Sequence, residues 1–343
     1  MKKLLTALLL TLGTVVLLCQ CSREDESSTV IRMGCFPNVT HVQGLVARNM
    51  WRHKSCNGKG WFENEIPGYT EEWYTFNAGP TAMEALFGKT VDVTYVGPSP
   101  ALNAYAVSAG REVRLLAGAV NGGSALMIAK NAPIQKPADF KGCSIATPQL
   151  GNTQDVSCRA WLIRHGLSCP LEGGGDCRVA PTPNAMQLQL MTQGDIAACW
   201  TVEPWVTRLE MHAGARIFEE EPNVVTTVLA SRVGWLKHNP QAAAQLIEAH
   251  KKLTQWILDN PEKARAHVAD EMMHLTQSDE KERAEFAEII NGAWNRMTLT
   301  NTVDVAGLEQ FVKDGQSTDL LDHVPPVQEM IYTPAAAPSN TAH

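Results

Sequence analysis

The sequence lacks the short motifs that mark common enzyme sites. Its 343 residues contain no G-x-S-x-G, H-E-x-x-H, G-x-x-x-x-G-K-[ST] or G-x-G-x-x-G pattern. Cys35 and His41 are close enough in the sequence to be imagined as a thiol and its base, but a cysteine that closes a strand is usually a packing residue. We therefore expect a protein that is not an enzyme and that has no cofactor.

Metal-ligand spacing and an excess of positive charge are missing as well. No two cysteines show C-x2-C spacing and no two histidines show H-x3-H spacing, so a zinc site is not expected. The net charge is −7, and it becomes −9 once Lys2 and Lys3 are removed. An acidic chain is a poor partner for nucleic acid. Any anionic ligand must therefore be held by local groups.

Long apolar runs are absent except at the N-terminus. Lys2 and Lys3 precede residues 4–18, a run without a charged residue, which is the pattern of a secretory signal. The run is shorter than the roughly 20 apolar residues that span a bilayer, and no later uncharged apolar segment reaches that length. Removing residues 1–20 leaves 323 residues, a length that favours two lobes with cores of their own.

The apolar run ends in a sequence that resembles a bacterial lipobox, Leu18-Cys19-Gln20-Cys21-Ser22. Cys21 is the expected lipidated residue because Leu18 stands three positions before it. Gln20 departs from the usual small residue, so cleavage with release of the chain is the alternative. The charged and Ser-rich residues 21–29 have no apolar periodicity, and we expect them to form a tether.

Cysteines are plentiful for an exported chain. Cys169 and Cys177 flank a loop with three consecutive glycines and are the best candidates for a disulfide. Cys143 and Cys199 lie in strand-like runs, where a reduced cysteine is usually a small core residue. An odd number remains after cleavage and lipidation, so at least one thiol stays free or pairs between molecules. The remaining seven are Cys35, Cys56, Cys143, Cys158, Cys169, Cys177 and Cys199.

Strand-like and helical patterns alternate along the first two thirds of the chain. This alternation predicts an α/β protein with largely parallel sheets. Three helices are expected in the last third, starting at Asn239-Pro240, at Asn260-Pro261 and near Ser278. The expected strands are 30–35, 73–76, 91–96, 113–117, 125–129, 143–147, 178–182, 197–201 and 224–231, and the expected helices between them are 41–52, 80–87, 100–109, 152–165 and 184–192.

Small or polar residues occupy six junctions at the ends of these strands. Ligands of open α/β sheets bind at the carboxyl ends of strands, where helix N-termini attract anions without a lysine or arginine. Proline in a first helical turn and glycine in a tight turn are also ordinary structural features, so one junction alone means little. Their recurrence favours a shared cleft. The junctions are 37–40, 77–80, 96–100, 121–124, 147–153 and 203–205.

Several of these residues have a structural alternative. Asn38, Thr40 and His41 could donate hydrogen bonds to an anion, or they could cap the helix that follows. Trp205 could form one wall of a ligand site, or it could cap a loop while Trp200 packs in the core.

At these junctions the sequence resembles the substrate-binding proteins of bacterial ABC importers for aliphatic sulfonates, nitrate and taurine, a group that shares its fold with thiamine-precursor-binding proteins. The resemblance runs from about residue 30 to 320. The sequence over 147–155 together with 96–100 looks closest to the sulfonate-binding branch. The matching stretches are 36–41, 75–86, 94–105, 147–162 and 203–205.

The resemblance implies a type II periplasmic-binding fold, in which two α/β lobes joined by two crossovers close over the ligand like a hinge. It also implies which residues face the cleft, namely Asn38, His41, Gly79, Ser99, Gln149, Asn152, Thr153, Glu203 and Trp205. The expected segments are lobe 1 over 30–127 and 227–325, lobe 2 over 128–226, crossovers near 125–130 and 224–231, and a tail over 326–343.

Three departures from the family pattern leave the substrate open, though not the fold. Cys35 stands where an aromatic residue is expected, residues 53–61 form an unusual insertion, and the cysteines from position 143 onward are atypical. The expected function is capture of a small anion, an aliphatic sulfonate first, on the periplasmic or cell-surface side of the membrane. The expected partners are an ABC permease and, through a lipid anchor, the membrane. The alternatives are a nitrate, taurine or thiamine-precursor binder, or an enzyme on the same fold such as a chorismate-processing enzyme.

Overall fold

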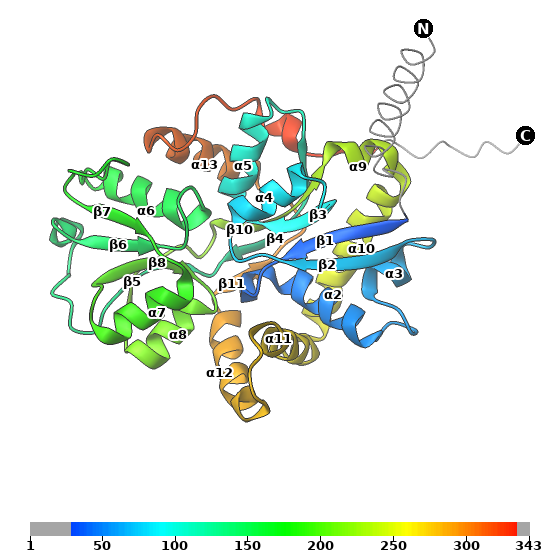
Figure 1. The fold of residues 1–343 in the computed structure, drawn as a ribbon, viewed down its shortest axis with the longest axis horizontal. Coiled ribbons are helices and arrows are strands. Elements are labelled where there is room, and N and C mark those ends of the chain that lie inside the picture. The colour runs from blue at the N-terminus through cyan, green and yellow to red at the C-terminus, as the bar shows by residue number, and fades with distance from the viewer. Residues whose placement is uncertain (1–28, 335–343) are drawn as a thin grey trace, which may run out of the picture.

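The computed structural model describes residues 29–334, which form two α/β lobes side by side (Figure 1). Lobe 1 is built on a six-stranded sheet with the order β11-β4-β10-β3-β1-β2, and lobe 2 on a five-stranded sheet with the order β7-β6-β8-β5-β9. The strands are β1 (Val30–Cys35), β2 (Thr70–Thr75), β3 (Val93–Val96), β4 (Val113–Gly122), β5 (Ser124–Ile128), β6 (Ser144–Thr147), β7 (Arg178–Pro181), β8 (Ala198–Val202), β9 (Arg216–Glu220), β10 (Val225–Arg232) and β11 (Met297–Leu299).

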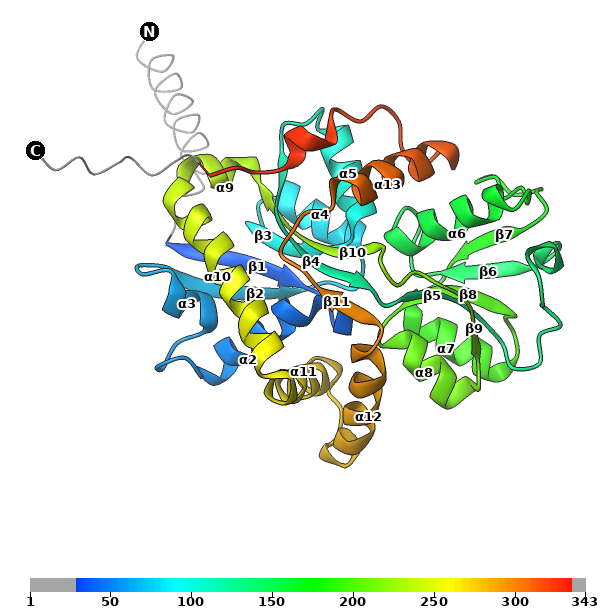
Figure 2. The ribbon, with the colours of Figure 1, turned by 180° about the vertical axis from the view of Figure 1, so that it is seen from behind.

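Helices cover both faces of the lobe 1 sheet, and Figure 2 shows α10 lying across one of them. The α-helices are α2 (Val42–His53), α3 (Trp61–Glu65), α4 (Gly79–Phe87), α5 (Pro98–Val107), α6 (Thr153–Arg164), α7 (Asn184–Gln193), α8 (Trp205–Ala213), α9 (Val233–His238), α10 (Pro240–Asp259), α11 (Pro261–Thr276), α12 (Arg283–Trp294) and α13 (Val305–Ser317). Short 3-10 helices are η1 (Val39–His41), η2 (Pro137–Phe140), η3 (Glu280–Glu282) and η4 (Val327–Met330).

Burial follows the apolar pattern of each element. The central strand β3 is buried at every position, whereas β2 at the edge of the sheet alternates exposed and buried residues over its first four positions. On α10, Leu246, Leu253 and Ile257 form the buried stripe that the helical spacing predicts. The lobe 1 sheet therefore carries a core on each face, one beneath α2, α10 and α11 and the other beneath α4, α5 and α13.

The sheets are mixed and not largely parallel, which corrects the expectation. β1 pairs in parallel with β2 and β3, and β6 pairs in parallel with β7 and β8. In contrast, β10 is antiparallel to β3 and β4, and β5 is antiparallel to β8 and β9. The antiparallel pairs arise where the chain crosses between lobes, because β4 runs directly into β5 and β9 returns directly into β10. A helix between two strands allows the second strand to run parallel to the first. Neither crossing contains such a helix.

The two crossings lie earlier than predicted. All of β5 belongs to the lobe 2 sheet and all of β10 to the lobe 1 sheet, so the chain crosses at Gly122-Gly123 and again at 221–224. The predicted crossings at 125–130 and 224–231 fall inside or across these strands. Both glycines have positive φ, +80° and +73°. A Cβ on Gly122 would come within 2.5 Å of the Arg296 carbonyl oxygen, so this crossing requires glycine.

The first part of the predicted tail is packed on lobe 1. Val327 and Met330 of η4 are buried against the core beneath α5. The Tyr332 N–H donates to the Leu115 carbonyl oxygen at 2.8 Å, which adds this segment to the edge of β4. The apolar residues of 327–332 explain the docking, whereas residues 335–343 lie outside the described part.

All seven cysteines between residues 29 and 334 are free thiols. Cys169 and Cys177 are both buried in lobe 2, where the Cys177 thiol donates to the Phe140 carbonyl oxygen at 3.2 Å. The structure therefore does not contain the expected disulfide between them, and their pairing stays a prediction. The expected signal sequence, Cys21 and nearly all of the tether lie outside the described residues. No helix between residues 29 and 334 is long and apolar enough to cross a membrane.

Candidate ligand-binding cleft

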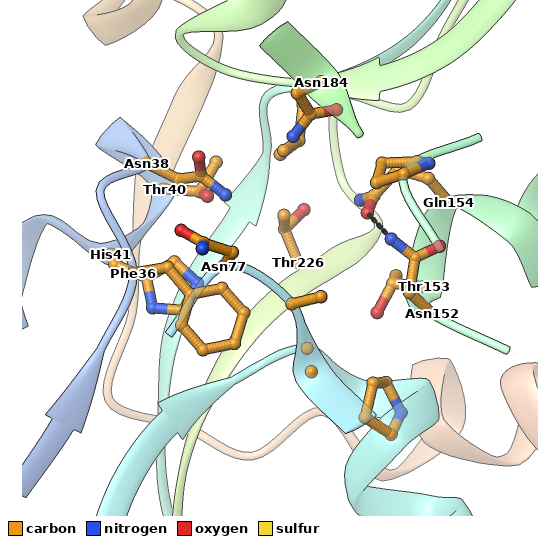
Figure 3. A pocket seen from close by; sticks show the side chains of 16 residues that line it. Phe36, Asn38, Thr40, His41, Asn77, Asn152, Thr153, Gln154, Asn184 and Thr226 are labelled. Carbon is orange, nitrogen blue, oxygen red and sulfur yellow. Dashed lines mark hydrogen bonds between the residues drawn. The ribbon is translucent and has the colours of Figure 1, made fainter. Parts of the chain in front are cut away.

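A cleft lies between the two lobes at the carboxyl ends of their parallel strands. Its inner cavity has a volume of about 30 Å³ and its outer cavity a volume of about 820 Å³. The two are parts of one cleft because they share lining residues from both lobes: Asn38, Asn77, Ala78, Pro148 and Asn184. Figure 3 shows side chains of both lobes facing each other across the inner cavity.

Strand ends bring the lining residues together. β1 ends just before Phe36 and Asn38, and β2 ends just before Phe76 and Asn77. In lobe 2, β6 ends at Thr147, directly before the loop that leads into α6. Carboxyl ends of parallel strands share one edge of a sheet. The junctions that are far apart in the sequence therefore meet at this cleft.

The N-termini of α4, α5 and α6 reach the inner cavity, which is lined by Gly79, Gly97, Asn152 and Thr153. The N-cap residues of α4 and α5 are alanine and glycine, and they make no side-chain cap. The first N–H groups of a helix have no partner within it, and its N-terminus favours negative charge. The Asn152 side chain caps α6 by accepting from the Asp155 N–H, and the N–H groups that remain at the three helix ends favour an anion at the cavity.

Two glycines allow these helix ends to approach each other. A Cβ on Gly79 would lie 2.2 Å from the Pro100 ring, and a Cβ on Gly97 would lie 2.3 Å from the Thr153 hydroxyl oxygen. The second contact joins lobe 1 to lobe 2. Neither glycine has positive φ, so the close approach and not the backbone conformation requires glycine.

Among residues 29–334, three of the twelve buried side-chain polar atoms without a partner belong to residues that line the cleft. These three atoms are His41 Nδ1, Thr153 Oγ1 and Gln149 Oε1. His41 and Thr153 line the inner cavity, and Gln149 lines the outer one. Leaving a buried polar atom unsatisfied costs about 1–3 kcal/mol. Native structures rarely leave several such atoms together unless a ligand or water satisfies them.

His41 acts as a neutral residue. Burial lowers its pKa from 6.5 to about 3. Its ring stacks on Phe36 with a centroid distance of 4.3 Å and an interplanar angle of 19°. Neutral imidazole offers one donor and one acceptor. Among the described residues, neither cavity is lined by aspartate, glutamate, lysine or arginine.

The outer cavity is bounded by rings. Phe76 comes from lobe 1 and Trp205 from lobe 2. Trp205 Nε1 donates across the cleft to Asn38 Oδ1 at 3.3 Å, and the Arg208 guanidinium lies 5.0 Å from the Trp205 ring centre. Trp205 is thereby held on two sides.

The structure brings seven of the nine predicted site residues to the cleft: Asn38, His41, Gly79, Gln149, Asn152, Thr153 and Trp205. Ser99 lines neither of these two cavities, although its neighbour Pro100 lines the inner one. Ser99 is buried in the first turn of α5, beside a separate cavity of about 20 Å³. Glu203 lines neither cavity. It is fully buried, accepts hydrogen bonds from the backbone N–H and hydroxyl of Thr207, and pairs with Arg296 at 2.9 Å.

Sequence reasoning missed several lining residues. Asn77 stood in a recognised junction, and Gln154 and Asn184 stand in the first turns of expected helices. Thr226 gave no local signal, because it reaches the cleft on the returning strand β10. No group of three or more histidine, cysteine or acidic residues suited to a metal ion occurs within residues 29–334.

Known proteins resemble this chain along most of its length. A taurine-binding periplasmic protein of Escherichia coli (strain K12) is 27% identical over 188 residues, which cover 48% of this chain and only 56% of that protein. A putative aliphatic sulfonates-binding protein of Bacillus subtilis (strain 168) is 23% identical over 292 residues, covering 76% of this chain and 84% of that protein. Both relatives bear the names of binding proteins and not of enzymes.

The solved structure of the periplasmic aliphatic sulphonate binding protein from Escherichia coli has the same fold. It superposes with a TM-score of 0.70 at 18% identity, covering 92% of this chain and 96% of that one. This match confirms the expected two-lobed α/β fold of a periplasmic binding protein. The sequence model of the NMT1-like family matches residues 24–273. The chain therefore belongs to the NMT1-like family.

Proposed function

We propose that this chain is the exported solute-binding component of an ABC importer and that its cleft holds a small organic anion, a sulfonate. The observation that carries the proposal is the inner cavity, where three helix N-termini meet the unpartnered polar atoms of His41 and Thr153, and where no charged side chain of the described residues forms part of the lining. Helix ends and neutral donors can hold an anionic group with several acceptor oxygens.

The similarity to sulfonate-binding and taurine-binding proteins supports the same function. Lobe closure over the ligand would create the surface that a membrane permease recognises. No covalent step is required, because the role of the chain is capture and release.

Isothermal titration calorimetry of the mature protein tests the proposal. Alkanesulfonates should bind, and nitrate, sulfate and a thiamine-precursor pyrimidine should bind more weakly or not at all. Replacing the Thr153 hydroxyl in Thr153→Val should weaken sulfonate binding about tenfold or more, since one buried hydrogen bond to a charged group contributes about 1.5–3 kcal/mol. Thr192→Val, on the exposed end of α7, is the matched control. Absence of binding to every anion would remove the proposal.

The lipid anchor at Cys21 is part of the same proposal, and it rests on the lipobox-like sequence alone. Mass spectrometry of the mature N-terminus should find a diacylated cysteine at position 21. An unmodified Cys21, or cleavage elsewhere, would remove the anchor and leave solute binding untouched.

A further inference from the structure

The outer cavity bears on the part of the ligand that is not the anionic group. Its volume of about 820 Å³ falls within the roughly 300–1,000 Å³ of pockets that enclose drug-sized organic molecules. The inner cavity, at about 30 Å³, is far smaller. Nitrate, or a sulfonate with a very short chain, would leave most of the cleft filled with water.

Flat apolar groups line this outer cavity from both lobes. Phe76 and Trp205 contribute aromatic rings, and four prolines also line the cavity: Pro37, Pro148, Pro181 and Pro183. Aromatic side chains contact other rings by offset stacking or edge-to-face contact, which is worth about 0.5–1.5 kcal/mol beyond the burial of area.

Trp205 is held in place by groups of the protein itself. Asn38 accepts its indole N–H from across the cleft, and the Arg208 guanidinium lies over its ring. Arg208 also lies 5.1 Å from the ring centre of Phe286 on α12, which ties the tryptophan to the body of lobe 1. A wall that is already ordered loses little entropy when a ligand stacks on it.

An ammonium group would meet no carboxylate in either cavity, since among residues 29–334 no carboxylate lines them. Asp155, two residues after Thr153, accepts hydrogen bonds from Thr147 Oγ1 at 2.8 Å and from the Gly151 N–H at 3.0 Å, and pairs with Arg159. Glu203, two residues before Trp205, is paired with Arg296. Burying an ammonium without a carboxylate is unfavourable.

Resting on the proposed function, we infer that the cleft selects organic sulfonates whose remaining part is uncharged and carries a ring, aryl sulfonates being the simplest, and rejects zwitterions of the taurine type. The anionic group would lie at the narrow inner end, and the ring between Phe76 and Trp205.

Two pairs of ligands test the inference by calorimetry on the mature protein. Benzenesulfonate and hexanesulfonate have the same number of carbon atoms and differ in the ring. Propanesulfonate and taurine have nearly the same shape and differ in the ammonium. We expect benzenesulfonate to bind at least about fivefold more tightly than hexanesulfonate, and propanesulfonate at least about tenfold more tightly than taurine.

Substitutions at the two aromatic residues test whether they cause the preference for benzenesulfonate. Phe76→Leu and Trp205→Leu should reduce the preference for benzenesulfonate over hexanesulfonate towards unity while both ligands still bind. Phe87→Leu is the matched control, because Phe87 is 40% exposed on α4 and lines neither cavity.

The outcomes separate the two proposals. If no sulfonate binds, the proposed function fails and the inference fails with it. If sulfonates bind but hexanesulfonate equals benzenesulfonate, or taurine equals propanesulfonate, the inference alone is overturned. An unchanged preference in both leucine variants would also overturn it.

Discussion

His41 illustrates how a single side chain sets the chemistry of the cleft. It is buried and stacked on Phe36, and its Nδ1 has no partner. Because burial lowers its pKa to about 3, it stays neutral at every pH at which the folded protein would normally be handled. The proposed anion would therefore be bound by dipoles and neutral donors and not by an imidazolium.

Ligand affinity should accordingly be nearly independent of pH. Between about pH 5.5 and pH 8 neither a sulfonate nor His41 changes charge. Calorimetric titrations across this range should give dissociation constants within about twofold of one another. An affinity that rises several-fold as the pH falls through 6.5 would show that His41 becomes charged on binding, and would contradict the neutral site.

A second buried residue, Glu71, makes stability depend on pH. Burial raises its pKa from 4.5 to about 8, although Trp73 Nε1 donates to it at 2.8 Å. Between these pKa values the folded state binds a proton that the unfolded state does not. Its contribution to stability is therefore fully present below pH 4.5 and is lost as the pH rises through about 8.

Glu71→Gln should remove this dependence. The variant's free energy of unfolding should exceed that of the wild type by about 1 kcal/mol or more near pH 8, and the difference should shrink towards pH 5, since one pKa unit corresponds to about 1.4 kcal/mol. Urea unfolding at several pH values measures it. Glu72→Gln, an exposed neighbour on β2, should leave the pH profile unchanged, and a parallel change in both variants would contradict the assignment.

At the scale of elements, the N-termini of α5 and α6 bring the two lobes together at the inner cavity. Gly97→Ala would force the Thr153 hydroxyl, 2.3 Å from the new Cβ, to turn away or the lobes to part. We expect sulfonate affinity to fall about tenfold or more while the melting temperature of the ligand-free protein changes little. Gly88→Ala at the end of α4, where the nearest atom is a carbonyl oxygen at 3.3 Å, is the control. Equal affinity in the two variants would refute this role.

The order of elements and most of the cleft were predictable from local patterns. Proline, glycine and asparagine at strand ends mark turns and helix starts whatever the rest of the chain does, so Asn38, Gly79 and Asn152 were found. Strand direction was not predictable from local patterns. β10 is antiparallel to β3, and β5 is antiparallel to β8, because β5 and β10 are the strands on which the chain enters a lobe after crossing from the other. Thr226 and the docked segment 327–332 depend on contacts distant in the sequence, which periodicity does not report.

At the scale of the whole molecule, Arg296 links the two lobes. It lies between α12 and β11 in lobe 1, and it pairs in lobe 2 with Glu203 at 2.9 Å, Glu210 at 2.7 Å and Glu220 at 3.7 Å. Glu203 is fully buried, so the loss of Arg296 would leave a buried carboxylate without a cation. The network favours the arrangement of lobes in which the cleft is formed.

Arg296→Met should lower the free energy of unfolding by about 3 kcal/mol and weaken ligand binding. The double variant Arg296→Met with Glu203→Gln should recover a large part of the loss, because the buried charge is gone. Arg283→Met, which breaks an exposed ion pair with Glu280, should cost less than about 1 kcal/mol. Urea unfolding of the wild type and the three variants measures these free energies of unfolding. A double variant no more stable than Arg296→Met would contradict this account.

Within residues 29–334, no charged side chain lines the cleft, and this has a consequence for the setting in which the protein would work. Attraction between exposed ions weakens as ionic strength rises, since the screening length falls from roughly 30 Å in 0.01 M salt to roughly 3 Å in 1 M salt. Buried dipoles that touch the ligand are screened far less. A carrier outside the cytoplasm is exposed to the ionic strength of its surroundings. A pocket of this kind would retain its ligand affinity at both low and high ionic strength.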